Sequence, residues 1–142
     1  MNTSSRSKSG LFLMELIIVV VFFAICAAIC MKVFAQAKKY NDTGYQLNNA
    51  TVLCQNCAEC FRAYDGNVIK TADKLGAAES SAEKAVFYYG SDFKSVSSVK
   101  KAYYSMTLTR TLSNGTYTAV INVCKKDGSS IQKITCAAVK GA

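Results

Sequence analysis

An apolar run near the N-terminus constrains the fold more than any other feature of the chain. Residues 11–31, LFLMELIIVVVFFAICAAICM, carry one charged side chain, Glu15. As an α-helix, these 21 residues rise about 31 Å, enough to cross a hydrocarbon core of roughly 30 Å. We therefore expect a transmembrane helix over residues 11–31. A carboxylate inside such a span is costly, so we expect Glu15 to have a function and a partner.

The residues before the span, MNTSSRSKSG, are polar and basic. Basic flanks stay on the cytoplasmic side of a membrane. Arg6 and Lys8 therefore place the N-terminus inside the cell and the chain after Met31 outside. The expected location is the cell membrane, crossed once.

Three features occur together here: a short basic leader that ends in Gly10, a hydrophobic Leu11, and Glu15 as the fifth residue after the glycine. This arrangement resembles the prepilin-type cleavage and methylation motif of type IV pilins and type II secretion pseudopilins. The resemblance covers residues 1–35. Leu11 stands where phenylalanine is usual and Phe12 where a small polar residue is common, and the chain has no proline to kink its helix.

The resemblance implies a pathway of processing and assembly. A prepilin peptidase would cut between Gly10 and Leu11, remove residues 1–10 as a leader peptide and N-methylate Leu11. The chain would wait in the lipid bilayer and then join other pilin or pseudopilin subunits at an inner-membrane assembly platform. Glu15 would act in that assembly, and the product would be an extracellular filament. The expected function is structural, with no cofactor.

Other interpretations of the same residues stay open. An ordinary secretory signal would combine the basic start and apolar core with a cleavage site at residues 35–37, Ala-Gln-Ala. A lipoprotein signal at Cys26 or Cys30 fits less well, because isoleucine precedes each cysteine. A plain membrane anchor leaves Glu15 unexplained.

Composition argues against an enzyme. Outside the leader and span, about 105 residues remain, enough for one small domain. Histidine is absent, which removes the commonest acid–base catalyst, and no nucleotide-binding loop or Ser-centred elbow occurs. The formal charge of +8 falls to +6 when Arg6 and Lys8 leave with the leader. This charge permits DNA contact, but lysines scattered from Lys70 to Lys140 are more typical of a solvated surface.

A helix with one buried stripe is predicted to continue the span over residues 32–65. Mostly small or apolar residues recur there at alternating spacings of four and three, a pattern typical of an amphipathic helix. They are Val33, Ala37, Tyr40, Gly44, Leu47, Thr51, Cys54, Ala58 and Phe61. The sequence Asp-Gly-Asn at residues 65–67 predicts the end of the helix.

Residues 66–142 are predicted to form a small extracytoplasmic domain with an antiparallel sheet. Residues 66–83 are small and polar and indicate a connecting loop with room for a helical turn, whereas residues 85–89, AVFYY, indicate a short strand. Two tight turns follow, Asn-Gly at residues 114–115 and Asp-Gly at residues 127–128.

Turn geometry and apolar alternation agree on one strand register. The first turn pairs Leu112 with Tyr117, Leu108 with Ile121 and Met106 with Val123; the second pairs Ile121 with Ile134 and Ala119 with Cys136. The sequence therefore predicts an α+β fold, with one long N-terminal helix packed on a small antiparallel sheet of three or four strands. The first half of that helix spans the membrane and the second half is amphipathic. The pilin resemblance implies the same architecture.

The Cys54-x-x-Cys57-x-x-Cys60 spacing offers an alternative function, a membrane-anchored extracytoplasmic protein that binds metal or does thiol chemistry. On a helix, however, Cys57 is turned about 60° from Cys54 and Cys60 about 120°, so the thiols diverge. Neighbours three apart have Cβ atoms about 5–6 Å from each other, and a disulfide needs roughly 3.5–4.5 Å. We expect Cys54 and Cys57 to be small buried residues, with Cys60 at the margin.

The other cysteines are also expected to stay unpaired. The strand register places Cys124 and Cys136 on opposite faces of the sheet, which excludes a disulfide between them. Cys26 and Cys30, one turn apart in the span, are small side chains suited to close helix contact in lipid.

Overall fold

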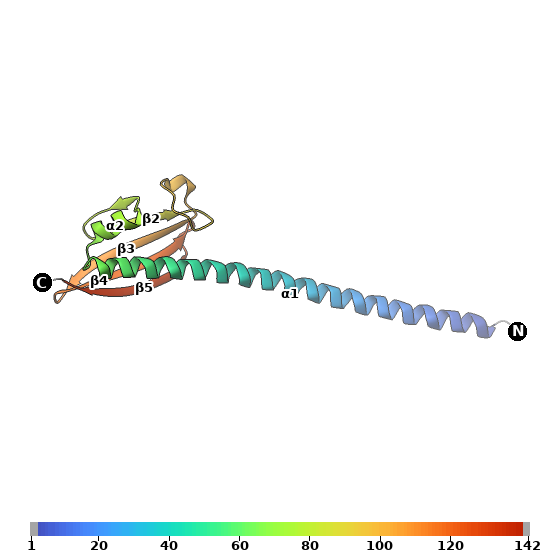
Figure 1. The fold of residues 1–142 in the computed structure, drawn as a ribbon. Coiled ribbons are helices and arrows are strands. Elements are labelled where there is room, and N and C mark those ends of the chain that lie inside the picture. Colours follow the sequence, from blue (N-terminus) through green and yellow to red (C-terminus); the bar gives the residue numbers. More distant parts are fainter. Residues whose placement is uncertain (1–2, 141–142) are drawn as a thin grey trace. The chain divides into compact units, whose positions relative to one another are not determined.

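The computed structural model describes residues 3–140 and their side chains from Lys8 onward, and it has an α+β fold (Figure 1). The chain forms α1 (Thr3–Ala63), α2 (Val68–Leu75), β1 (Glu79–Ser80), β2 (Lys84–Tyr89), a 3-10 turn η1 (Val99–Lys101), β3 (Tyr104–Ser113), β4 (Thr116–Lys125) and β5 (Ser130–Val139). It divides into two compact units, Met1–Thr43 and Gly44–Ala142, and α1 contributes to both.

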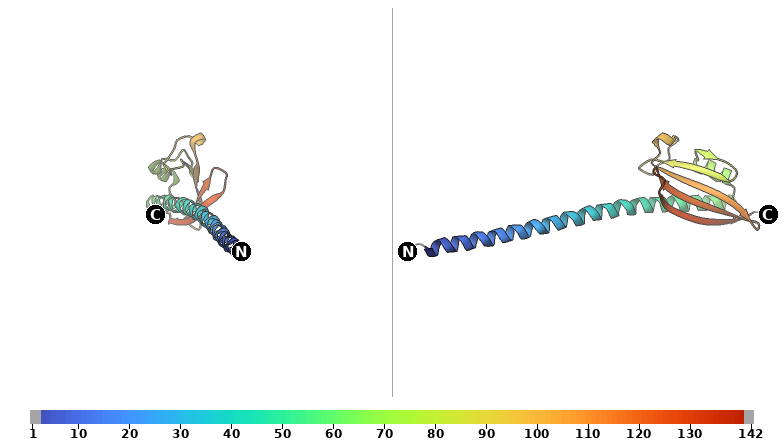
Figure 2. Two further views of the ribbon diagram at one scale, coloured as in Figure 1. Left: turned by 90° about the vertical axis from the view of Figure 1, so that its right-hand side faces the viewer. Right: turned by 180° about the vertical axis from the view of Figure 1, so that it is seen from behind.

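The second unit contains an antiparallel sheet of five strands in the order β1-β2-β3-β4-β5. The prediction of three or four strands was therefore too low, because the two-residue β1 adds an edge strand beside β2. The part of α1 in this unit lies along one face of the sheet (Figure 2). The predicted packing of the helix on an antiparallel sheet is confirmed.

The core of the second unit lies between α1 and the sheet. The fully buried side chains include Phe61 from α1, Phe87 from β2, Met106 and Leu108 from β3, and Ile121 and Val123 from β4. Alternate residues of β3 and β4 are buried, as expected when one face of a sheet packs and the other meets solvent. This core consists of residues between Ala50 and Ala138.

The buried stripe of α1 is shorter than the sequence pattern predicted. Cys54, Ala58 and Phe61 are buried as expected, but Val33 is 57% exposed and Tyr40 is 75% exposed. The first fully buried residue of the helix is Ala50. The apolar pattern continues from residues 11–31 along the helix, whereas the sheet covers α1 only from about Ala50 onward.

Both predicted hairpins and their registers are confirmed. Leu112 pairs with Tyr117, and Leu108 with Ile121; Ile121 in turn pairs with Ile134. The first turn has positive φ at Asn114 (49°) and Gly115 (75°), the conformation that favours Asn-Gly in a two-residue hairpin. The predicted strand at residues 85–89 is confirmed as β2.

Residues 66–83, predicted as a connecting loop with room for a helical turn, contain more regular structure than expected, since α2 and β1 occupy much of this segment. Helix α2 begins after Asn67, whose side chain accepts a hydrogen bond of 3.1 Å from the Lys70 backbone N–H. It ends at Gly76, which has φ of 73°. Val68, Thr71 and Ala72 are buried, so this helix belongs to the core and packs beside β1 and β2.

Candidate functional site

The apolar segment of the first unit is helical and exposes its side chains. Leu11, Phe12 and Phe23 are each at least 67% exposed, and the other large apolar residues up to Met31 are also exposed. By length and composition, α1 is long and apolar enough to cross a membrane. An exposed apolar surface of this extent is typical of a membrane or protein interaction site.

The predicted cleavage and assembly residues lie together on this segment. Gly10, Leu11 and Glu15 are all exposed on α1. A Cβ atom built at Gly10 would meet no atom within 4 Å apart from its chain neighbours and the backbone of its own helix, so no other part of the chain covers this position. Leu11 and Glu15 are one helical turn apart, which places them on the same face about 6 Å from each other along the axis. The structure thus brings the three residues onto one short stretch.

Glu15 has no ion-pair partner among residues 8–140, where the one salt bridge joins Lys94 and Asp92. An embedded carboxylate must therefore find its partner outside this part of the chain or stay in contact with water. Residues 35–37, the alternative signal-peptide site, lie within the same continuous helix. In the apolar segment of α1, Cys26 is half-buried and Cys30 is exposed.

The three cysteines of the Cys-x-x-Cys-x-x-Cys stretch are placed as predicted. Cys54 and Cys57 are fully buried, and Cys60 is half-buried at the margin. Burial raises the pKa of Cys54 to about 11. Burial also raises the pKa of Cys57 to about 12, with smaller contributions from the thiols of Cys136, Cys54 and Cys60. Thiols with such pKa values stay protonated at neutral pH and are poor nucleophiles and poor metal ligands.

No three metal-binding side chains gather at one point within the described part of the chain. The structure therefore gives no support to a metal centre at Cys54, Cys57 and Cys60. All seven cysteines are free. Cys136 is buried on the core face of β5, whereas the half-buried Cys124 accepts a hydrogen bond of 3.2 Å from the Asn122 side chain. The prediction that Cys124 and Cys136 lie on opposite faces is confirmed.

The raised pKa values predict slow thiol modification. At about pH 8, iodoacetamide should modify Cys54 at least about 100-fold more slowly than an exposed cysteine, because a pKa two units higher leaves 100-fold less thiolate and burial blocks access. Mass spectrometry of peptides after timed alkylation measures this. Cys124, which is half-buried outside the core, serves as the more accessible comparison, and urea should make the rates equal. Similar rates for Cys54 and Cys124 in the folded protein would contradict the buried placement.

The same shifts predict a loss of stability at alkaline pH. The folded protein holds the thiol protons more tightly than the unfolded chain, whose cysteine pKa is 9.0. Stability from Cys54 and Cys57 is therefore fully present below that value and falls as the pH rises from there through about 11 and 12. Urea midpoints measured at several pH values up to about 10.5 should decline in the wild type. They should decline less in a Cys54→Ala variant.

Sequence reasoning did not find a polar hollow at one end of the second unit. It has a volume of about 380 Å³, and three of its lining residues are basic: Lys70, Arg110 and Lys140. These residues come from α2, from β3 and from the end of the chain after β5. They have no common motif, so no local signal in the sequence could have grouped them.

Comparison of the chain with protein-family models gave no match. Comparisons with curated proteins and with solved structures gave none either.

Proposed function

We propose that the chain is a structural subunit, pilin-like or a pseudopilin, of a type IV pilus or a type II secretion-like filament. One observation carries the proposal: Glu15 lies at the head of an exposed apolar helix, five residues after Gly10, and that helix continues into an α+β unit. A simple anchor requires the apolar surface alone. It does not require a carboxylate at this position.

The processing steps follow from the motif. The precursor is held in the bilayer by residues 11–31, with its N-terminus inside and Gly44–Ala142 outside. A prepilin peptidase cuts after Gly10 and methylates Leu11. An inner-membrane platform then moves the subunit from lipid into a bundle of other subunits.

Assembly needs more than apolar surface. Lipid tails are as apolar as leucine side chains, so moving the helix from bilayer to filament gains little from the hydrophobic effect. Close packing at small residues such as Ala24, Ala27 and Ala28 contributes to association. Pairing of buried polar groups contributes more specifically, because it selects one arrangement of neighbours.

Glu15 supplies such a polar group. Cleavage creates a positively charged amine on Leu11, one helical turn from the carboxylate. In a neighbouring subunit, that amine can pair with Glu15 where both are removed from water. An unpaired charge there costs several kcal/mol, so the register that joins the two groups is favoured.

The mature protein is expected to begin at Leu11, because glycine at position 10 leaves the backbone open to the peptidase. Intact mass and N-terminal sequencing of protein from the native host test this. Gly10→Val should slow cleavage at least about tenfold, which corresponds to an increase of about 1.4 kcal/mol in the activation free energy. Gly44→Val is the matched control, because a Cβ at Gly44 also meets no atom within 4 Å. A mature start at Lys38 would instead show an ordinary signal peptide and remove the pilin proposal.

The rival function, a thiol or metal site at Cys54, Cys57 and Cys60, can be separated from this proposal by measuring metal in the purified chain. One equivalent of zinc or iron lost in a Cys57→Ser variant would favour the rival. DNA contact is a weaker possibility for the same filament, driven only by scattered charge. Any such binding should fall steeply with salt.

A further inference from the structure

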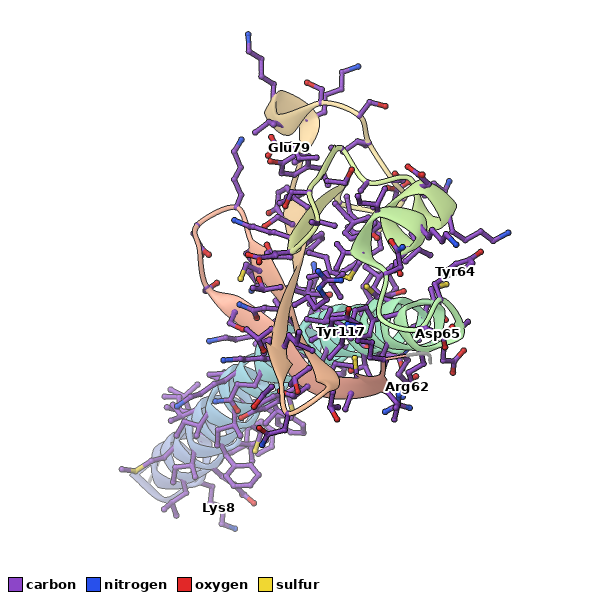
Figure 3. All side chains as sticks on the ribbon, turned by 90° about the vertical axis from the view of Figure 1, so that its left-hand side faces the viewer. Lys8, Arg62, Tyr64, Asp65, Glu79 and Tyr117 are labelled. Atoms are coloured by element: carbon purple, nitrogen blue, oxygen red, sulfur yellow. The ribbon has the colours of Figure 1, made fainter. Side chains whose placement is uncertain are left out.

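The polar hollow lies where the turn after α1 meets the end of the β3–β4 hairpin. Its wall includes Tyr64, Asp65 and Asn67 from the turn, and Arg110 and Tyr117 from the two strands. Figure 3 looks at the second unit from this end, with Tyr64, Asp65 and Tyr117 labelled. The volume of about 380 Å³ is within the usual range for a small-molecule site.

Packing holds the wall of the hollow in a fixed shape. Gly66 is buried with φ of +78°, and a Cβ atom there would lie 2.6 Å from Cδ2 of Tyr117. Only glycine fits between the turn and this ring. Asp65, directly before it, also has positive φ, at 51°. The backbone of the turn is thus packed against β4 beside the hollow.

Arg110 is restrained by the same contact. Its Nη1 donates a hydrogen bond of 3.1 Å to the Gly66 carbonyl oxygen, and its guanidinium carbon lies 4.6 Å from the centre of the Tyr117 ring. A guanidinium has five N–H donors in a fixed plane. The Gly66 carbonyl takes one of them, and none of the others has a side-chain or backbone acceptor among residues 8–140. A half-buried cation is therefore held in position with donors to spare.

The charge around the hollow is positive. Arg110, Lys70 and Lys140 line it, against one carboxylate, that of Asp65. No ion pair joins Asp65 to any of these cations, since the one salt bridge within residues 8–140 lies elsewhere. Uncompensated positive charge beside a preorganised guanidinium favours an anion with two oxygens in one plane.

We propose that this hollow binds a small oxyanion, a carboxylate or phosphate group. Arg110 binds two of its oxygens, while Lys70 and Lys140 neutralise its charge. Asp65 and the Tyr64 hydroxyl favour a carrier that also has hydroxyl groups, as acidic and phosphorylated sugars do. All its residues belong to the second unit, and none lies in the apolar helix, so the proposal does not depend on the proposed function.

The test uses the full-length protein in a neutral detergent at low ionic strength. Sodium glucuronate, inorganic phosphate and uncharged glucose are each titrated by isothermal calorimetry. We expect saturable binding of glucuronate or phosphate, at one per chain, and no binding of glucose. Glucuronate alone would identify a carboxylate site and phosphate alone a phosphate site. Absence of saturation by either anion at about 10 mM, weaker than most specific ligands, would overturn the proposal.

Matched variants separate a site from diffuse charge. The double variant Lys70→Gln/Lys140→Gln should weaken binding about fivefold, the effect of losing two exposed charge contacts. The control Lys100→Gln/Lys101→Gln removes the same charge next to the start of β3, at the other end of that strand, and should stay within about twofold. Equal weakening by both pairs would show that net charge alone attracts the anion and would overturn the site.

Arg110→Lys tests the planar contact. It keeps the positive charge but loses the paired donors, so anion affinity should fall at least about tenfold. Circular dichroism and the urea midpoint show whether this variant folds. If it does not fold, the Lys70→Gln/Lys140→Gln variant and its control still test the site. Wild-type affinity in a folded Arg110→Lys variant would contradict the role of the guanidinium.

Discussion

Glu15→Val is expected to give a cleaved, membrane-inserted protein that enters filaments at less than about one tenth of the wild-type level. A loss of about 1.4 kcal/mol in assembly free energy already gives that factor. Removing one partner of a membrane-embedded charge pair costs more than this, because the other charge is left unpaired. In the variant, the amine of Leu11 would have no carboxylate in the neighbouring subunit. The measurement compares sheared filaments with the membrane fraction by immunoblot, in the native host.

The matched control is Glu59→Val, which makes the same change on the same helix. Glu59 is exposed and lies in the second unit, so its loss should leave incorporation unchanged. Gly10→Val provides a second comparison, because an uncut chain lacks the free amine and should also fail to assemble. Normal incorporation of Glu15→Val would mean that this carboxylate stays wet at the headgroup level. That result would remove the main mechanistic claim.

The strand register could be read from the sequence because two independent signals agree on it. Asn114 and Gly115 both accept positive φ, which fixes the turn, and alternation in β3 and β4 fixes which face is buried. A slip of one residue would turn Leu108 and Ile121 to solvent. Few competing arrangements satisfy both conditions, so local chemistry was sufficient.

Helix α2 was missed because its signal is short. Its eight residues make little more than two turns, too few for periodicity to stand out among small and polar neighbours. The capping residues were visible, with Asn67 before the helix and Gly76 after it. The Asp-Gly-Asn sequence at residues 65–67 indicates the end of a helix, but the Asn67 side chain also caps the start of α2.

The length of the buried stripe on α1 could not be predicted from the sequence either. Small and apolar residues continue from Val33 to Phe61 without a change in pattern, but a pattern does not say where a sheet begins to cover it. Ala50 lies off the predicted row and is fully buried, because the sheet covers a wider face than one heptad seam. The polar hollow shares this dependence on tertiary contacts: Arg110 meets Gly66 across 44 residues of chain.

Phe61→Ala is expected to lower the free energy of unfolding of the second unit by about 3–5 kcal/mol. The Phe61 side chain is fully buried between α1 and the sheet, so its removal loses apolar burial and leaves a cavity in the core. A unit of this size is stable by roughly 5–15 kcal/mol, so a substantial part of that stability would be lost. Alkylation of Cys54 and Cys57 along a urea series reports unfolding in the full-length protein.

The control is Phe34→Ala, at a side chain that is 77% exposed. It should change the free energy of unfolding by less than about 0.5 kcal/mol. Equal effects of the two substitutions would contradict the core described here, because the buried stripe would then include residues well before Ala50.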